Sequence, residues 1–225
     1  MNSETNRRKF LSSTAVVSIG FPALIPASAL GRNGSVAPSN RIVVGGIGVG
    51  RRGQKVLDSF LQQRDTQFVA VADPQKARRE LIKSEADKHY GNRDCAIYDD
   101  MSGVLERDDI DAVLVTTGDR WHATASIYAA RAGKDIYCEK PCAMNIQECQ
   151  ELDDNIKKHG RVFQAGTQRR SVPNFRLAAD LALKGKLGQV KEVHAGILQL
   201  QDYLDPLPAQ NEPDPAIIDW DKWLG

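Results

Sequence analysis

The stretch Arg41-Ile-Val-Val-Gly-Gly-Ile-Gly48-Val-Gly50-Arg-Arg-Gly53 determines the fold that we expect for this chain of 225 residues. It begins with an apolar run typical of a buried strand and continues into a G-x-G-x-x-G turn. An amphipathic helix is predicted directly after the turn. This order of elements binds the pyrophosphate of a dinucleotide, whereas the alternative is a glycine-rich turn without a ligand. We therefore expect a cofactor to contact Gly48, Val49, Gly50 and Gly53.

A carboxylate follows the second apolar run of the chain. The run covers residues 68–72 and ends at Asp73, twenty positions after Gly53. An acidic residue at this distance accepts hydrogen bonds from the adenosine ribose and repels a 2′-phosphate, so we expect NAD rather than NADP. Basic residues that follow closely weaken this preference. Asp73 could also be the N-cap of a helix that starts at Pro74, and the two roles are compatible.

Strand and helix patterns alternate over residues 41–166, which predicts an α/β domain: a Rossmann-type parallel sheet with helices on both faces. Strands are expected near residues 41–47, 67–72, 112–116, 134–138 and 161–165, and helices near 51–62, 74–88, 121–132 and 146–158. A short edge strand is expected at Ala96–Tyr98. Residues 167–225 are interpreted as the start of an α+β substrate domain, with a helix over 172–183 and a strand over 191–201. We expect the rest of that domain to lie beyond residue 225.

The N-terminal residues 1–29 resemble a twin-arginine export signal. Arg7 and Arg8 precede an apolar stretch, and Ala27-Ser28-Ala29 is a cleavage site. A membrane anchor is disfavoured because serine, glycine and proline interrupt the apolar run. Residues 30–40 then form a polar linker. We expect an exported, periplasmic protein that is not attached to the membrane after processing.

The composition indicates an ordinary globular protein, with 41% hydrophobic residues, 26% charged residues and a formal net charge of +1. This balance gives no sign of a nucleic-acid partner. No cysteine pair has C-x-x-C spacing, so no metal site is expected. An exported protein could form a disulfide, but Cys138 and Cys142 flank a Glu-Lys-Pro segment and are interpreted as small buried residues.

Further motifs follow the glycine turn and Asp73. They are Thr116-Thr-Gly-Asp-Arg-Trp121-His122, Glu139-Lys140-Pro141, Gly166-Thr-Gln168-Arg-Arg170 and Asp219-Trp-Asp-Lys-Trp-Leu-Gly225. In this order they resemble the motifs of the Gfo/Idh/MocA oxidoreductases, and Glu-Lys-Pro is the specific element among them. The resemblance implies an NAD-dependent oxidoreductase that acts on a secondary hydroxyl of a sugar or polyol. It also implies that the full-length protein can form homo-oligomers.

The resemblance further implies roles for individual residues. Lys140 is the expected catalytic residue, which would hydrogen-bond the reacting hydroxyl and assist proton transfer. The alternative is a surface lysine before a turn proline. The Lys140–Pro141 peptide is expected to be cis. Cofactor contacts are expected from Thr116, Thr117, Trp121, His122, Glu139 and Gln168. For Trp121 and His122, a purely structural role is an equally good interpretation.

Two other functions compete with the oxidoreductase. One is an NAD-assisted glycoside hydrolase of the same family, which oxidises and re-reduces its sugar without net redox change. Such relatives are expected to lack the lysine of Glu-Lys-Pro, so Lys140 favours the oxidoreductase. The other is a dinucleotide-binding module without catalysis, which predicts cofactor binding and no turnover. The sequence does not identify the sugar.

Overall fold

The computed structural model describes residues 30–31, 36–196, 211 and 214–224. The chain divides into two units, residues 1–41 and residues 42–225. Within its described residues, the first unit contains one regular element, the 3₁₀ turn η1 (Pro38–Asn40), inside the predicted linker. The predicted export signal lies outside the described residues.

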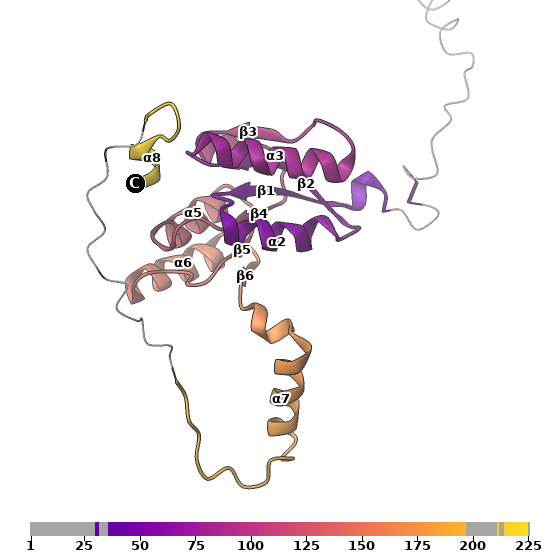
Figure 1. Ribbon diagram of the computed structural model, residues 1–225, viewed down its shortest axis with the longest axis vertical. Helices are drawn as coiled ribbons and strands as arrows, with labels where there is room; N and C mark the ends of the chain where they lie inside the picture. Colours follow the sequence, from indigo (N-terminus) through magenta and orange to yellow (C-terminus); the bar gives the residue numbers. More distant parts are fainter. Residues whose placement is uncertain (1–29, 32–35, 197–210, 212–213, 225) are drawn as a thin grey trace, which may run out of the picture. The chain divides into compact units, whose positions relative to one another are not determined.

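The second unit is built on a six-stranded sheet in which all paired neighbours are parallel (Figure 1). The order is β3-β2-β1-β4-β5-β6, so it reverses between β1 and β4, which is the switch point of a Rossmann sheet. The predicted sheet and its edge strand are confirmed. The strands are β1 (Ile42–Ile47), β2 (Thr66–Ala72), β3 (Ala96–Tyr98), β4 (Ala112–Val115), β5 (Asp135–Cys138) and β6 (Phe163–Ala165).

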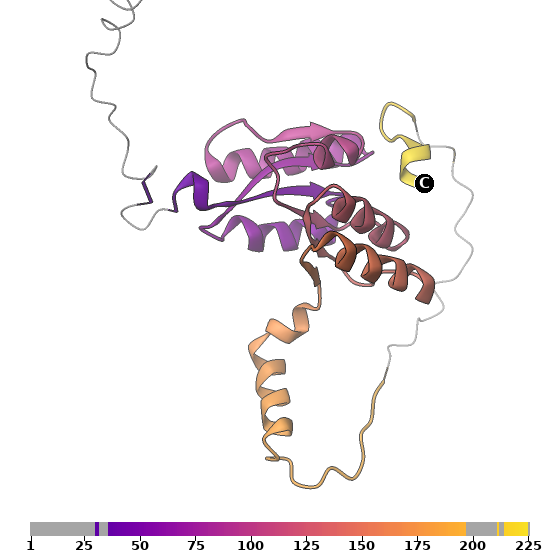
Figure 2. The same cartoon turned by 180° about the vertical axis from the view of Figure 1, so that it is seen from behind.

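Helices cover both faces of the sheet, as predicted (Figure 2). Along β4, Val113 and Val115 join one apolar cluster and Leu114 joins the other, because strand side chains alternate between faces. The cluster around Leu114 includes residues of α2 (Arg51–Leu61) and α3 (Lys76–Tyr90). The opposite cluster includes residues of α4 (Ser102–Leu105), α5 (Asp119–Arg131) and α6 (Ile146–His159).

The start of α3 differs from the prediction. Helix α3 begins at Lys76, and its N-cap is Gln75, which makes no side-chain cap. The Asp73 carboxylate accepts a hydrogen bond from the Gln75 N–H at 2.8 Å. This local turn places Pro74 before the helix, so the proposed N-cap role of Asp73 is wrong.

Beyond the sheet, the chain forms the 3₁₀ turn η2 (Gln168–Ser171), helix α7 (Pro173–Leu183) and helix α8 (Trp220–Leu224). Helix α7 confirms the predicted helix, and none of its residues is buried. The strand predicted over residues 191–201 is not formed in its described part, because residues 191–196 have no regular structure. A strand needs a partner to bury its apolar face, and none pairs with this segment among the described residues.

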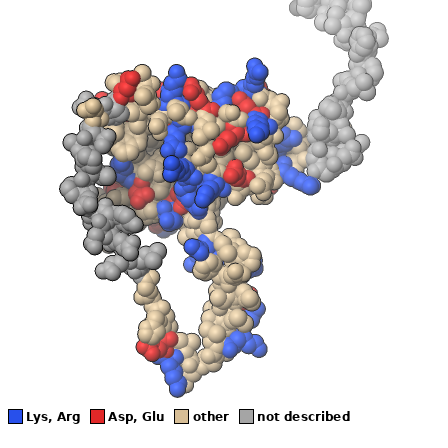
Figure 3. All heavy atoms as spheres, in the orientation of Figure 1, with Lys and Arg blue, Asp and Glu red and all other residues tan. Residues whose placement is uncertain are grey.

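The surface of the described chain carries both signs of charge. On the face that Figure 3 draws, acidic and basic side chains both occur, in line with the net charge of +1. No described helix has the length and apolar character needed to cross a membrane.

Candidate functional site

The glycine turn has the geometry that a dinucleotide requires. Gly48 has a φ of +65°, and a Cβ atom there would lie 2.4 Å from the Thr117 methyl carbon. A Cβ on Gly53 would lie 2.3 Å from Thr116 Oγ1, so α2 can pack this closely only with glycine. A Cβ on Gly50 would meet no protein atom within 4 Å. The turn is therefore tight on the protein side and open on the ligand side.

The N-terminus of α2 supplies donors to this open space. Gly50 is the N-cap of α2, and the first N–H groups of a helix have no intrahelical acceptor. Such a helix end fits an anion, including the pyrophosphate of a dinucleotide. Val49 differs from its neighbours because its side chain is fully buried in the core. Only the backbone of Val49 is available for the cofactor contact that the sequence predicted.

Asp73 lies at the carboxyl end of β2 with 8% of its surface exposed. Burial raises the pKa of its carboxyl above the usual 3.8, and the Gln75 amide and the charges of Arg78 and Arg79 offset part of this effect. The Gln75 amide occupies Oδ1. The carboxylate can still accept hydrogen bonds from the ribose hydroxyls of adenosine.

A cavity of about 260 Å³ opens at the switch point of the sheet. Its lining includes predicted cofactor residues from three segments, namely Gly48, Gly50, Asp73, Thr116, Thr117 and Trp121. It also includes residues to which the sequence assigned no role, among them Gln75, Asp99 and Met101. A larger, more open depression of about 910 Å³ contains no residue of the glycine turn, so we assign the dinucleotide to the smaller cavity.

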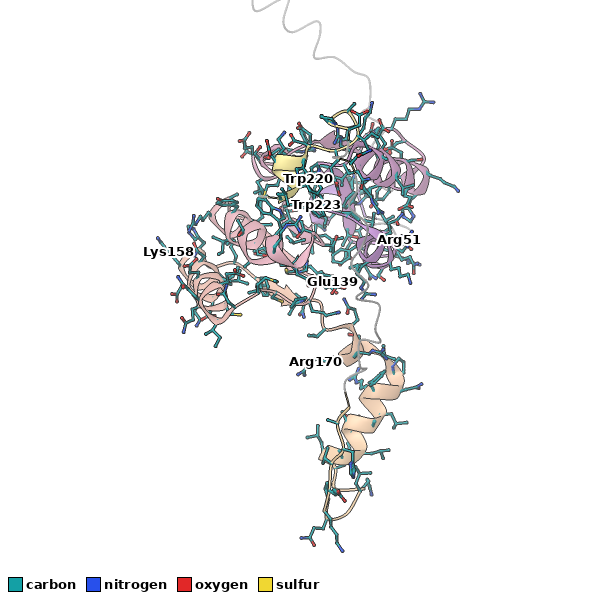
Figure 4. The ribbon with its side chains drawn as sticks, turned by 60° about the vertical axis from the view of Figure 1, so that its left-hand side comes forward. Arg51, Glu139, Lys158, Arg170, Trp220 and Trp223 are labelled. Atoms are coloured by element: carbon teal, nitrogen blue, oxygen red, sulfur yellow. The ribbon has the colours of Figure 1, made fainter. Side chains whose placement is uncertain are left out.

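The Glu-Lys-Pro segment lies at the same edge of the sheet, directly after β5. Lys140 is exposed there, and its peptide bond to Pro141 is cis, as predicted. Glu139 (labelled in Figure 4) is only 3% exposed. Its carboxylate accepts hydrogen bonds from Arg52 Nε at 2.5 Å, Gln168 Nε2 at 2.6 Å and Lys140 N at 2.7 Å. Glu139 therefore fixes the backbone of Lys140 and connects β5 to α2.

Arg52 is a neighbour of Glu139 that the sequence did not reveal, although it stands inside the G-x-G-x-x-G turn. Burial acts to raise the pKa of Glu139, but Arg52, the Lys140 amide and Gln168 outweigh it, so the pKa falls below the usual 4.5. A carboxyl whose folded-state pKa is lowered stabilises the fold above its unfolded pKa. This contribution is lost as the pH falls through the folded pKa.

We predict that Arg52→Ala lowers the free energy of unfolding by about 1–2 kcal/mol at pH 7, because the buried Glu139 loses a charged partner while the half-exposed Arg52 is partly screened. The loss should shrink below pH 4.5, where Glu139 becomes protonated in the unfolded chain. Urea unfolding of the variant and the unmodified chain, at pH 7 and at a pH below 4.5, measures this loss of unfolding free energy. Arg51→Ala is the matched control, since Arg51 is exposed and no ion pair involves it in the described part of the chain. Equal losses in the two variants would contradict the assignment.

His122 is brought to the Glu-Lys-Pro segment but not to the cavity. Its side chain is 2% exposed, with Nδ1 at 2.6 Å from the Pro141 carbonyl oxygen and Nε2 at 3.2 Å from that of Thr117. The ring therefore joins the start of α5 to the ends of β4 and β5. Because both ring nitrogens face backbone carbonyl oxygens, the contacts support the structural interpretation of His122, and its cofactor contact stays a prediction.

Gln168 has a similar supporting position. Its amide donates to Glu139 and, at 3.2 Å, to the Tyr137 hydroxyl.

The described residues contain no cluster of three or more potential metal ligands. The four cysteines are free, with Cys138 fully buried and Cys142 partly buried. Burial raises the pKa of Cys138 to about 12, which makes it an unreactive thiol.

The family model GFO_IDH_MocA, described as "Oxidoreductase family, NAD-binding Rossmann fold", matches residues 42–167. The 2,7-anhydro-N-acetylneuraminate hydratase of Mediterraneibacter gnavus is 30% identical over 149 residues, which are 66% of this chain. Glycosyl hydrolase family 109 protein 1 of Shewanella sp. (strain MR-4) is 30% identical over 174 residues, covering 68% of this chain.

Among solved structures, scyllo-inositol dehydrogenase from Lactobacillus casei, with bound NAD(H) and scyllo-inositol, superposes with a TM-score of 0.58. The two sequences are 27% identical, and the match covers 66% of this chain. The chain spans well under half the length of the proteins it matches: 37% of the two curated relatives and 43% of the crystallised dehydrogenase.

Proposed function

We propose, from the premise that this chain belongs to the Gfo/Idh/MocA oxidoreductase family, that its parent protein is an NAD-dependent dehydrogenase acting on a secondary hydroxyl of a sugar or polyol. The observation that carries this proposal is the position of Lys140. Lys140 follows β5, one strand beyond β4 and at the same sheet edge as the glycine turn after β1. A proton-transferring group and a dinucleotide cradle therefore share one edge.

In this proposal, residues along this edge have separate roles in cofactor binding, proton transfer and positioning. The backbone of Gly48 to Gly53 and the N-terminus of α2 bind the pyrophosphate, and Asp73 binds the adenosine ribose. Lys140 accepts and returns the proton of the substrate hydroxyl. Glu139 and its partners hold the backbone of Lys140 in place. The nicotinamide, when bound, supplies the redox chemistry.

The cofactor preference yields a second prediction. Asp73→Ala should weaken NAD binding by about 1–3 kcal/mol, because the ribose hydroxyls lose a charged acceptor. Since ribose donates to the ionised carboxylate, the affinity of the unmodified chain should fall as the pH drops through the raised pKa of Asp73. Asp73→Asn should lack this pH dependence.

Calorimetric titration with NAD and NADP at pH 7 and at pH 5 measures these effects. Asp58→Ala is the control, because Asp58 is an exposed aspartate on α2. An unmodified chain that prefers NADP, or an Asp73→Ala variant with full NAD affinity, would contradict the ribose assignment.

A second candidate function is NAD-assisted glycoside hydrolysis. The glycosyl hydrolase family 109 relative favours it, whereas Lys140 favours the dehydrogenase. The two are separated by incubating the full-length protein with polyols and with glycosides in the presence of NAD. Net NADH formation supports the dehydrogenase. Release of free sugar without net NADH supports the hydrolase, and binding without either product supports a non-catalytic module.

We also propose that residues 1–29, which lie outside the described residues, direct export to the periplasm by the twin-arginine route. The support is the Arg7-Arg8 pair ahead of an apolar stretch and an A-x-A site. Replacing both arginines by lysine should leave the precursor in the cytoplasm in a fractionation experiment. Unchanged processing of that variant would contradict the proposal.

A further inference from the structure

Residues 214–224, which end in α8, contact the loops after β2 and β3 and the first turn of α5, and we name them the C-terminal strap. The backbone of the strap pairs with the loop after β2. Lys76 N donates to the Ile217 carbonyl oxygen at 3.1 Å, and Asp219 N donates to that of Pro74 at 3.3 Å. The strap therefore lies at the sheet edge that carries the glycine turn.

Side chains attach the strap to the loop after β3 and to the first turn of α5. Lys222 Nζ lies 2.7 Å from the Asp99 carboxylate, which follows β3. The Arg120 guanidinium stacks on the Trp223 ring at 3.9 Å, and the side chains of Arg120 and Trp121 both donate to the Trp223 carbonyl oxygen. Trp220 stacks against Trp223 with ring centroids 4.9 Å apart (Figure 4). One short segment thus contacts two loops and the start of a helix.

The strap forms part of the wall of the dinucleotide cavity. Lys222 and Trp223 line it together with Gly48, Gly50 and Asp73. In this fold the ribose-binding carboxylate after β2 marks the adenosine half of the cofactor. Since the strap contacts the loops beside Asp73, it faces that half.

The strap is attached mainly by hydrogen bonds and one ion pair rather than by a core. None of the residues of α8 is buried, and Trp223 is 38% exposed to solvent. A segment that buries so little apolar surface opens at a lower free energy than the sheet beneath it. It can therefore open and close without unfolding the domain.

We propose that the C-terminal strap closes over the adenosine half of the dinucleotide and slows its release, with Arg120 and Trp223 forming the wall against the adenine. This inference rests on the dinucleotide binding of the proposed function and adds binding residues beyond residues 42–167. A planar guanidinium stacked on an indole offers the flat, polarizable surface that a purine ring favours.

The test is the rate of NADH release, measured by stopped-flow displacement from the unmodified chain and its variants. Trp223→Ala should release NADH roughly tenfold faster with little change in the association rate, since changes in closing contacts act mainly on dissociation. Lys222→Ala should accelerate release to a smaller extent. Lys157→Ala is the matched control, because it also breaks an exposed lysine–aspartate pair, on α6. It should leave the rate unchanged.

A charge exchange keeps the test decisive if Trp223→Ala does not fold, as judged by circular dichroism. Lys222→Asp alone should accelerate release, and its combination with Asp99→Lys should restore the original rate. Release at the original rate from folded Trp223→Ala and Lys222→Ala would overturn the strap while leaving dinucleotide binding in place. An unmodified chain that does not bind NADH would instead overturn both the strap and the proposed function.

Discussion

Replacing Lys140 by alanine is expected to lower kcat by about 10²–10⁴-fold, the contribution typical of a general acid–base group. Affinity for NAD should change little. The pyrophosphate and ribose contacts come from the glycine turn and Asp73, which line a cavity whose wall does not include Lys140. The two effects are separated by single-turnover reduction of NAD and by NAD titration on the same samples of full-length protein.

Two further variants define the role of Lys140. Lys140→Arg should not restore turnover, because a guanidinium cannot release a proton near neutral pH. Lys158→Ala, which removes an exposed lysine from α6, should leave both kcat and NAD affinity unchanged. If Lys140→Ala retains full turnover, Lys140 is a surface lysine before a turn proline, and the proposed reaction loses its proton-transfer group.

The sheet and its helices could be predicted because their signals are local. The apolar runs of β1 and β2 and the periodic pattern of α2 are each contained in a short window of sequence. Glycines that can adopt a left-handed conformation are a local signal of the same kind for helix ends: Gly133 and Gly160 follow α5 and α6 with φ values of +77° and +60°. The start of α3 was misplaced because the Asp73 turn competes with a helix cap, and both use the same residue types.

The contacts that hold the Glu-Lys-Pro segment could not be predicted, because they join residues far apart in the chain. Arg52 and Glu139 are 87 positions apart, and His122 and Pro141 are 19 apart. Both contacts form only once the parallel sheet has aligned the ends of its strands. Composition and periodicity contain no signal for such pairs. A histidine in the first turn of α5 fits either the cofactor or the backbone until the fold is known.

The contacts of the C-terminal strap could not be predicted from the sequence either, although its motif could be recognised there. Its Trp-Asp-Lys-Trp motif was visible in the sequence as part of a family resemblance, but nothing in the motif indicates which surface it contacts. The separation between Trp223 and Arg120 is 103 positions. Only the folded arrangement places Lys222 and Trp223 at the cavity beside the glycine turn, so the role that we propose for the motif rests on the structure rather than on the pattern.

Gly50→Ala is expected to weaken NAD binding roughly 100-fold or more, with a change in the free energy of unfolding below about 1 kcal/mol. The backbone of Gly50 has a φ of −79°, which alanine adopts without strain, and its added Cβ meets no protein atom within 4 Å. The methyl group would instead occupy the open space in front of α2. There it would displace the pyrophosphate from the helix amides, whose charge-assisted hydrogen bonds contribute about 1.5–3 kcal/mol each.

Gly53→Ala provides the contrasting control, because the same added atom has the opposite consequence there. A Cβ at Gly53 would overlap Thr116 Oγ1 and lie 2.9 Å from a Val49 methyl carbon, so α2 must move away from β4. That variant should lose about 1–3 kcal/mol of stability, as overpacked cores do. Thermal unfolding and NAD titration on both variants therefore separate packing from ligand space. If Gly50→Ala binds NAD as tightly as the unmodified chain, the pyrophosphate does not lie in front of Gly50. The open side of the glycine turn would then need another explanation.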